Sequence, residues 1–252
     1  MRVGIVGSSY SVGRHHNFKT GTSDLALPFE TWLDKHTDGM QFFNAACAGK
    51  GTELYLNKVV YLKDQYDIDI LLIEIVNNRS MVYVKCLPEN YKSIISEIYM
   101  SQLEKDVYRS SRSSYSYWRA LIQDMEEVTF SPNKKKFEIW KEIQWNIAAT
   151  DYAMEFWGML DIYQTIKLCN MLGIKCVLWE KSWDFIELPS FRNMLQGSKF
   201  VEFPGHNNAH KYYVGKYGLE NILCDHDHFN DKVNDEMVRD FIGPALMEVK
   251  NG

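Results

Sequence analysis

The chain has 252 residues, of which 46% are hydrophobic and 24% are charged, proportions that are typical of a soluble globular protein. The formal net charge of −5 argues against a nucleic-acid-binding protein that works through a broad basic face. No apolar run reaches the ~18 residues that a membrane span needs. The length suits one large α/β domain better than two ordinary domains.

Hydrophobic patterning predicts strands that alternate with helices along most of the chain. The predicted strands are residues 2–6, 41–44, 69–76, 174–179 and 200–203, and the predicted helices are residues 52–65, 161–172 and about 230–249. Residues 69–76 form the clearest strand, because a nearly continuous apolar run is typical of a parallel strand covered on both faces. Gly173 is a favoured residue for ending the helix before it. This alternation predicts a three-layer α/β/α sandwich with a mainly parallel sheet.

The region from about residue 80 to residue 158 breaks this alternation. It is rich in aromatic residues and has a largely helical pattern, with no internal repeat and no low-complexity linker. We interpret it as a helical insertion packed on a single domain that spans residues 1–252. Most of its aromatic side chains are expected to lie in a core, and some could form a wall of the site.

The first of four polar segments at predicted strand ends is Gly7-Ser8-Ser9-Tyr10-Ser11. A serine in a tight turn after a buried strand is held exposed, and its own N–H can help to bind an oxyanion, so Ser9 is a candidate nucleophile. A turn that only caps the next helix explains the segment equally well. A phosphate-binding loop fits less well, because neither common glycine-rich pattern is present.

The second and third segments offer hydrogen-bond donors. Small residues follow Asn44, and Gly49 among them could direct its N–H into a pocket, although a tight turn between a strand and a helix also explains them. The third segment is Glu74-Ile75-Val76-Asn77-Asn78-Arg79. An Asn side chain there can donate to developing negative charge, and an Asx turn is the alternative.

The fourth segment places Asp225 and His228 three residues apart before the last predicted helix. The carboxylate can hold one nitrogen of the imidazole while the other acts as a general base. A metal site that combines these residues with His206 and His210 is the main alternative, and a purely structural turn is another. No HExxH or His-triad spacing is present, so we expect neither a metal nor a cofactor.

The order of the four segments resembles the SGNH hydrolases, also called GDSL esterases. Ser9 matches the nucleophile of G-D-S-x-S, with Ser8 in place of the usual Asp, and Asn44 and Gly49 match N-x-x-x-x-G. Glu74 and Asn78 match E-[LF]-G-x-N-D, although Val76 and Arg79 replace the usual Gly and Asp. Asp225, His228 and Asn230 match D-x-x-H-x-N. The adjacent Asn77 keeps the choice of oxyanion donor open, and the register from Glu74 favours Asn78.

The resemblance implies a flavodoxin-like SGNH hydrolase fold and a serine esterase. Its triad would be Ser9, His228 and Asp225, and its oxyanion hole would include Gly49 and Asn78. The polar loops favour a short acyl group, such as acetyl, on a polar carrier such as a glycan. A non-catalytic binding or structural module with this fold is an alternative, as is an acyltransferase that uses the same triad.

The cysteine pattern and the first residues indicate the compartment. The five cysteines are an odd number without a CxxC pair, and Cys47, Cys169 and Cys176 have apolar neighbours typical of small buried residues. This pattern favours a reducing compartment. The chain starts directly with a strand-like segment and shows no signal peptide. We therefore expect a cytoplasmic protein, and a role in a phage particle stays open.

Overall fold

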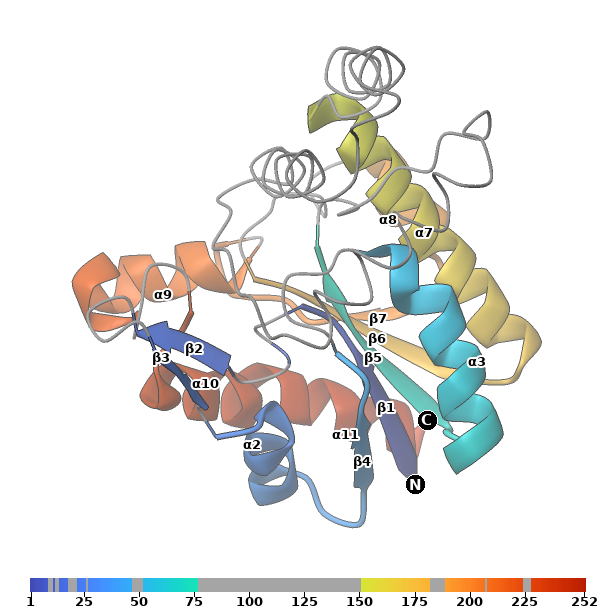
Figure 1. The fold of residues 1–252 in the computed structure, drawn as a ribbon, viewed down its shortest axis with the longest axis horizontal. Helices are drawn as coiled ribbons and strands as arrows, with labels where there is room; N and C mark the ends of the chain where they lie inside the picture. The colour runs from blue at the N-terminus through green and yellow to red at the C-terminus, as the bar shows by residue number, and fades with distance from the viewer. Residues whose placement is uncertain are drawn as a thin grey trace, which may run out of the picture.

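The protein is described from a computed structural model. The structure describes residues 1–8, 11, 14–17, 22–25, 27–46, 52–76, 151–181, 189–206, 208–223 and 228–252. Its centre is a five-stranded parallel sheet with the strand order β4-β1-β5-β6-β7 (Figure 1). The strands are β1 (Arg2–Val6), β4 (Gln41–Asn44), β5 (Ile70–Ile75), β6 (Lys175–Glu180) and β7 (Lys199–Phe200). Counted along the chain, this is the 2-1-3-4-5 order of flavodoxin-like sheets.

The middle strand β5 is buried along its whole length because apolar layers cover both of its faces. Ile70 and Leu72 pack into the cluster on one face, and Leu71, Ile73 and Ile75 pack into the cluster on the other. Side chains of a strand alternate between the two faces of a sheet, so a strand between two layers needs apolar residues at successive positions. The strand predicted over residues 69–76 is confirmed.

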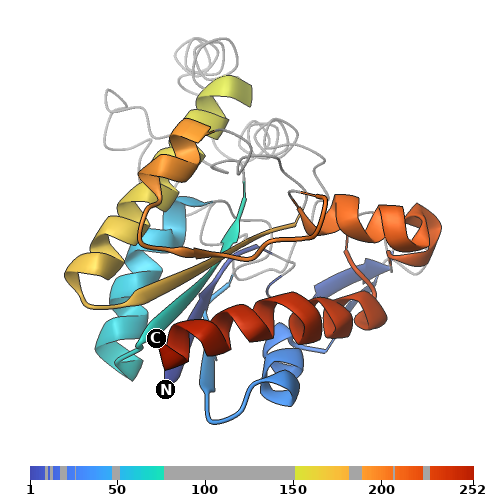
Figure 2. The same cartoon turned by 180° about the vertical axis from the view of Figure 1, so that it is seen from behind.

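Helices form a layer on each side of the sheet (Figures 1 and 2). One layer contains α3 (Tyr55–Tyr66) and α7 (Asp151–Met171), and the other contains α2 (Phe29–His36), α10 (Asp231–Met237) and α11 (Gly243–Asn251). Further described elements are η1 (Thr52–Leu54), α8 (Pro189–Met194), α9 (Ala209–Tyr217) and η4 (Leu219–Asn221). The predicted three-layer α/β/α architecture is confirmed.

Two features before residue 40 differ from the prediction. Strands β2 (Arg14–Asn17) and β3 (Thr22–Leu25) form an antiparallel pair, and α2 precedes β4. The hairpin strands carry polar residues without the alternation that identifies a strand in a sequence. Helix α2 has eight residues and buries only Phe29 and Leu33, so its apolar pattern is short.

The strand predicted over residues 200–203 is shorter in the structure, where β7 ends at Phe200. A turn runs from Phe203 to His206, in which His206 N donates to Phe203 O at 2.9 Å. Its central residues are Pro204 and Gly205, and Gly205 has a φ of +74°. Proline followed by a glycine with positive φ is typical of a type II turn, which ends the extended segment.

Helix α7 begins ten positions earlier than the start predicted at Asp161, at Asp151. The insertion expected over residues 80–158 lies outside the described residues as far as residue 150, and its last residues form the first turns of α7. The end of this helix follows the prediction. Gly173 N donates to Asn170 O and Ile174 N donates to Cys169 O, which is the Schellman pattern for a glycine at this position.

The last predicted helix, about 230–249, is a continuous run of α10, the π-helical turn η5 (Val238–Ile242) and α11. Asn230 caps its start, because its side chain accepts a hydrogen bond from Val233 N at 3.1 Å. The π-turn comes just before Pro244, which has no N–H for the backbone ladder.

Cys169 on α7 and Cys176 on β6 are buried free thiols, as predicted. A hydrogen bond with Cys169, together with burial, raises the pKa of Cys176 well above its ordinary value. Cys47, Cys86 and Cys224 lie outside the described residues. None of the helices in the described part of the chain combines the length and the apolar character that a bilayer span requires.

Candidate active site

The carboxyl ends of β1, β5 and β6 meet at one edge of the sheet (Figure 1). In register, Val6 near the end of β1 lies beside Ile73 of β5, and Ile73 lies beside Leu178 of β6. The strand after β1 in this sheet, β4, lies on one side of β1, and the next strand, β5, lies on the other side. Because the connections after β1 and after β4 run in opposite directions, a crevice opens between β1 and β5 at the carboxyl ends of the strands. Ligands of such folds bind in that crevice.

Four of the five predicted catalytic residues lie outside the described residues: Ser9, Gly49, Asn78 and Asp225. The fifth, His228, is described and only 3% exposed. The approach of Ser9 to His228 therefore stays a prediction. Ser8 and Ser11, which lie on either side of the predicted nucleophile, are described, and they show what holds this loop.

The buried carboxylate of Glu74 binds the loop on both sides of Ser9. Its Oε1 accepts a hydrogen bond from Ser8 Oγ at 2.5 Å. Its Oε2 accepts from Ser8 N at 3.0 Å, from Ser11 N at 3.2 Å and from Ser11 Oγ at 2.6 Å. Two residues that are three positions apart are thereby tied to one side chain of the neighbouring strand.

The pleat of the sheet explains why Glu74 faces this loop. Val3 and Ile5 of β1 pack into the same cluster as Ile70 and Leu72 of β5, so the next alternate position on β5, Glu74, also faces that side. The Tyr55 hydroxyl fixes the backbone at this point by donating to Glu74 O at 2.8 Å.

Gly7 leaves the space that this arrangement needs. A Cβ at Gly7 would lie 2.4 Å from Ser11 Oγ and 2.6 Å from Glu74 Oε2, which is closer than real Cβ contacts. Gly7, which the sequence places in a predicted turn, therefore has a specific structural role. It allows the carboxylate to approach the backbone of the loop.

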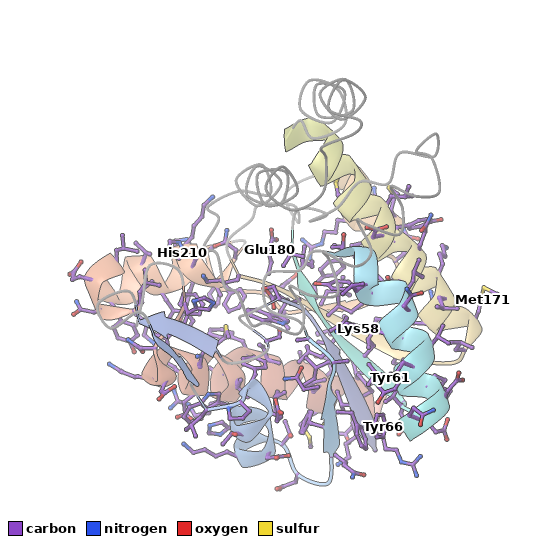
Figure 3. The ribbon with its side chains drawn as sticks, viewed as in Figure 1. Lys58, Tyr61, Tyr66, Met171, Glu180 and His210 are labelled. Carbon is purple, nitrogen blue, oxygen red and sulfur yellow. The ribbon has the colours of Figure 1, made fainter. Side chains whose placement is uncertain are left out.

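Charged side chains are buried at this edge of the sheet. Glu74 and Glu180 are 0% exposed, and Lys181 is 3% exposed. Figure 3 shows Glu180 where β6 reaches this edge. Burial raises the pKa of the Glu74 carboxyl above its ordinary value, while hydrogen bonds from Ser11 and Ser8 and the charge of Lys181 act in the opposite direction. Buried charges are rare and costly, and clusters of them are typical of functional sites.

Asn44 at the end of β4 holds the other side of the loop. Its Nδ2 donates to Ser11 O at 2.7 Å and to Glu30 Oε2 at 2.6 Å, and its Oδ1 accepts from Ala46 N at 2.9 Å. Lys58 of α3 donates to Ala45 O (Lys58 is labelled in Figure 3). These contacts anchor the first residues of the segment that carries the predicted oxyanion donor.

The segment that contains His228 packs on the end of β6. The Lys181 ammonium lies 5.2 Å from the centre of the Phe229 ring, and His210 at the start of α9 stacks on the same ring at 6.3 Å (His210 is labelled in Figure 3). His210 N also donates to Lys181 O at 2.6 Å. A bridge between Leu223 and Phe229 closes the intervening loop. The segment that carries the predicted base therefore lies at the same edge of the sheet as the Glu74-bound loop.

The sequence matched Glu74 to a family motif but indicated no role for it, and it did not identify Lys181 as a residue of the site. The available signal was a charge directly after an apolar run, Glu74 after residues 70–73 of β5, and Glu180 and Lys181 after residues 176–179 of β6. Within the described ranges, no three His, Cys, Asp or Glu side chains are placed to hold a metal ion. Residues 225–227 lie outside those ranges, so the metal alternative is untested.

The comparisons with known proteins found no family model and no curated protein that matches the chain. Among solved structures, TesA matches with a TM-score of 0.46 and 10% identity over 99% of each chain. A catalytic mutant of Axe2, an acetylxylan esterase from Geobacillus stearothermophilus, matches with a TM-score of 0.47 and 10% identity, over 98% of this chain and 92% of the other. LAE5, an alpha/beta hydrolase enzyme from the metagenome of Lake Arreo, Spain, matches with a TM-score of 0.40 and 10% identity, over 99% and 94%. Scores and identities of this size are too low to assign an activity.

Proposed function

We propose that this chain is a serine hydrolase of carboxylic esters, with Ser9 as its nucleophile. The observation that carries the proposal is the hydrogen bonding of the two neighbouring serines, Ser8 and Ser11. Ser8 and Ser11 are buried, and both of their hydroxyls donate to Glu74 at 2.5 and 2.6 Å. A hydroxyl that is committed to a buried carboxylate is not available for attack on a substrate. Ser9 is then the serine of this loop that is left for that task.

The position of His228 supports the second part of the proposal. A general base has to lie near the nucleophile, and His228 is held at the same sheet edge through the contact of its neighbour Phe229 with Lys181. In the proposed triad, Asp225 orients the imidazole, and the polar loop closed by the bridge between Leu223 and Phe229 carries both residues.

The proposed reaction has two steps. Ser9 Oγ attacks the ester carbonyl while His228 takes its proton, and the oxyanion is held by the N–H groups of Ser9 and Gly49 and the side chain of Asn78. His228 then gives the proton to the leaving alcohol, and an acyl-enzyme remains. Water attacks this ester with His228 again as the base, which releases the acid and restores Ser9.

A short acyl group on a polar carrier, such as a glycan, is the proposed substrate class. Buried polar and charged groups surround the site end of β6, including Glu180, Lys181, Asn208 and His228. Polar residues at this edge, together with the polar loops noted in the sequence, favour a carrier with hydroxyl groups over a long alkyl chain, which would need a continuous apolar surface. Hydrolysis of acetylated sugars can be compared with hydrolysis of C8–C12 esters, and a preference for the long chains would contradict this choice.

The nucleophile is tested by labelling with a fluorophosphonate probe and by hydrolysis of p-nitrophenyl acetate. Ser9→Ala should abolish labelling and nearly all hydrolysis. Asn78→Ala should lower kcat by about 10²–10³ and leave a measurable remainder. The matched control is Ser198→Ala, which removes a serine hydroxyl next to β7 and should leave both activities unchanged.

Four results would count against the proposal. Hydrolysis by Ser9→Ala at the wild-type rate would remove Ser9 from the nucleophile position. Folded wild-type protein that neither labels nor hydrolyses esters would favour a binding module instead. Loss of activity with EDTA would favour the metal alternative, and acyl transfer to added alcohols in preference to water would favour a transferase.

A further inference from the structure

We propose that Glu74 is a positioning residue for this reaction, whose carboxylate holds the loop from Gly7 to Ser11 in the conformation that presents Ser9 to the substrate. The inference rests on the proposed function and adds a task for a residue that lies outside the triad. Ser9 and Tyr10 are the residues between the two serines that Glu74 binds.

The geometry of the contact is specific for a carboxylate. An ionised carboxylate only accepts hydrogen bonds, and it offers about four lone-pair positions. Four donors converge on Glu74, namely the N–H and the hydroxyl of Ser8 and those of Ser11. Two backbone N–H groups are among them, so the contact fixes the path of the main chain and not only the side chains.

The anchor is itself rigid. The Tyr55 hydroxyl holds the carbonyl of Glu74 at 2.8 Å, and residues 74 and 179 are paired in the sheet. Asn44 fixes the far end of the loop by donating to Ser11 O at 2.7 Å. A catalytic group works best when its support is packed and hydrogen-bonded, because small displacements of the reacting atoms are costly.

Stability alone does not account for a charged residue at this position. Burying a carboxylate costs free energy, and well-packed apolar residues often replace buried ion pairs without loss of stability. Apolar residues fill the preceding positions on the same face of β5, Ile70 and Leu72. Lys181 partly compensates the charge of Glu74, and it also contacts the ring next to His228. The charge of Lys181 therefore acts on Glu74, while its ammonium contacts the segment that carries the proposed base.

The test compares Glu74→Gln with Glu236→Gln. Glutamine has nearly the same shape as glutamate, but its Nε2 is a donor and would face the donors of the loop. Glu236 is the matched control, because it is also a buried carboxylate that accepts hydrogen bonds from two side chains, Tyr217 and Lys216, and it lies in α10, outside the Glu74-bound loop. The measurements are the fluorophosphonate labelling rate, kcat and KM for p-nitrophenyl acetate, and the melting temperature.

We expect Glu74→Gln to lower the labelling rate and kcat by about 10²-fold, the loss that follows removal of one oxyanion-hole donor, with KM within about threefold of wild type. Glu236→Gln should keep kcat within about twofold of wild type, even if it melts earlier. A folded Glu74→Gln that labels at the wild-type rate overturns the inference. An equal loss of kcat in both variants also overturns it, because that result indicates a general effect on the fold.

Two further variants decide the matter if Glu74→Gln does not fold. Ser8→Ala and Ser11→Ala each remove one hydroxyl donor and keep the backbone N–H bond to the carboxylate. Each should lower kcat about 10-fold with little change in KM. Wild-type kcat in both variants overturns the inference. The proposed function fails separately, when the wild-type protein itself does not label.

Discussion

Replacement of Gly7 by alanine tests the packing of the candidate site directly. The new Cβ would lie 2.4 Å from Ser11 Oγ and 2.6 Å from Glu74 Oε2, where ordinary contacts begin at 3.4 Å. Ser11 and Glu74 would each have to move by nearly 1 Å, a large shift on the scale of van der Waals contacts. That movement would break the 2.6 Å hydrogen bond between them.

The expected cost follows from these contacts. Loss of a hydrogen bond to a charged group costs about 1.5–3 kcal/mol, and overpacking of a core costs about 1–3 kcal/mol. Because the two effects overlap, we expect Gly7→Ala to lower the free energy of unfolding by about 3 kcal/mol. For a domain of this size, that loss corresponds to a decrease in melting temperature of about 6–12 °C.

Gly4 of β1 provides the matched control. A Cβ at Gly4 would lie 2.8 Å from the Cδ1 atoms of Leu62 and Ile68, which are the far ends of flexible apolar side chains. These ends can shift, so Gly4→Ala should cost about 1 kcal/mol and leave fluorophosphonate labelling unchanged. Thermal melting followed by circular dichroism and the labelling rate are measured for both variants. Equal melting temperatures, or normal labelling of Gly7→Ala, would refute the packing argument.

Three further predictions concern the rest of the described fold. Asn230→Ala removes the N-cap of α10 and should lower the free energy of unfolding, measured in urea, by about 1 kcal/mol. It should also slow fluorophosphonate labelling, because His228 is two residues away. An unchanged urea midpoint would contradict this prediction. Gly173→Ala places a side chain at a φ of +70° and should cost about 1 kcal/mol without changing activity; a more stable variant would show that the strain is absent. Burial raises the pKa of Asp235, but hydrogen bonds from Lys35 and His36 of α2 lower it below its ordinary value overall. The carboxylate of Asp235 therefore binds a proton more tightly in the unfolded chain than in the folded protein. The stability from Asp235 is then present above the ordinary carboxyl pKa of about 4 and is lost as the pH falls below it. The melting temperature between pH 6 and pH 3 should therefore decline less for Asp235→Asn than for wild type, and an equal decline would refute the reasoning.

The sequence by itself determined the class of fold. The apolar run before Val76 and the alternation of strands with helices identified a covered parallel sheet, because burial on both faces imposes a local pattern on a strand. Gly173 marked the end of α7, since a positive φ is a local requirement. The order of Ser9, Gly49, Asn78 and the Asp225–His228 pair along the chain suggested the chemistry.

Only the tertiary structure decided how this edge of the sheet is held together. Glu74 binds Ser8 and Ser11 across more than 60 positions of sequence because β1 and β5 are neighbours in one register. Lys181, directly after β6, contacts Phe229 for a similar reason. Local periodicity shows which face of a strand is buried, but it carries no information on which strand lies beside it, so contacts between distant segments are fixed only when the sheet is assembled.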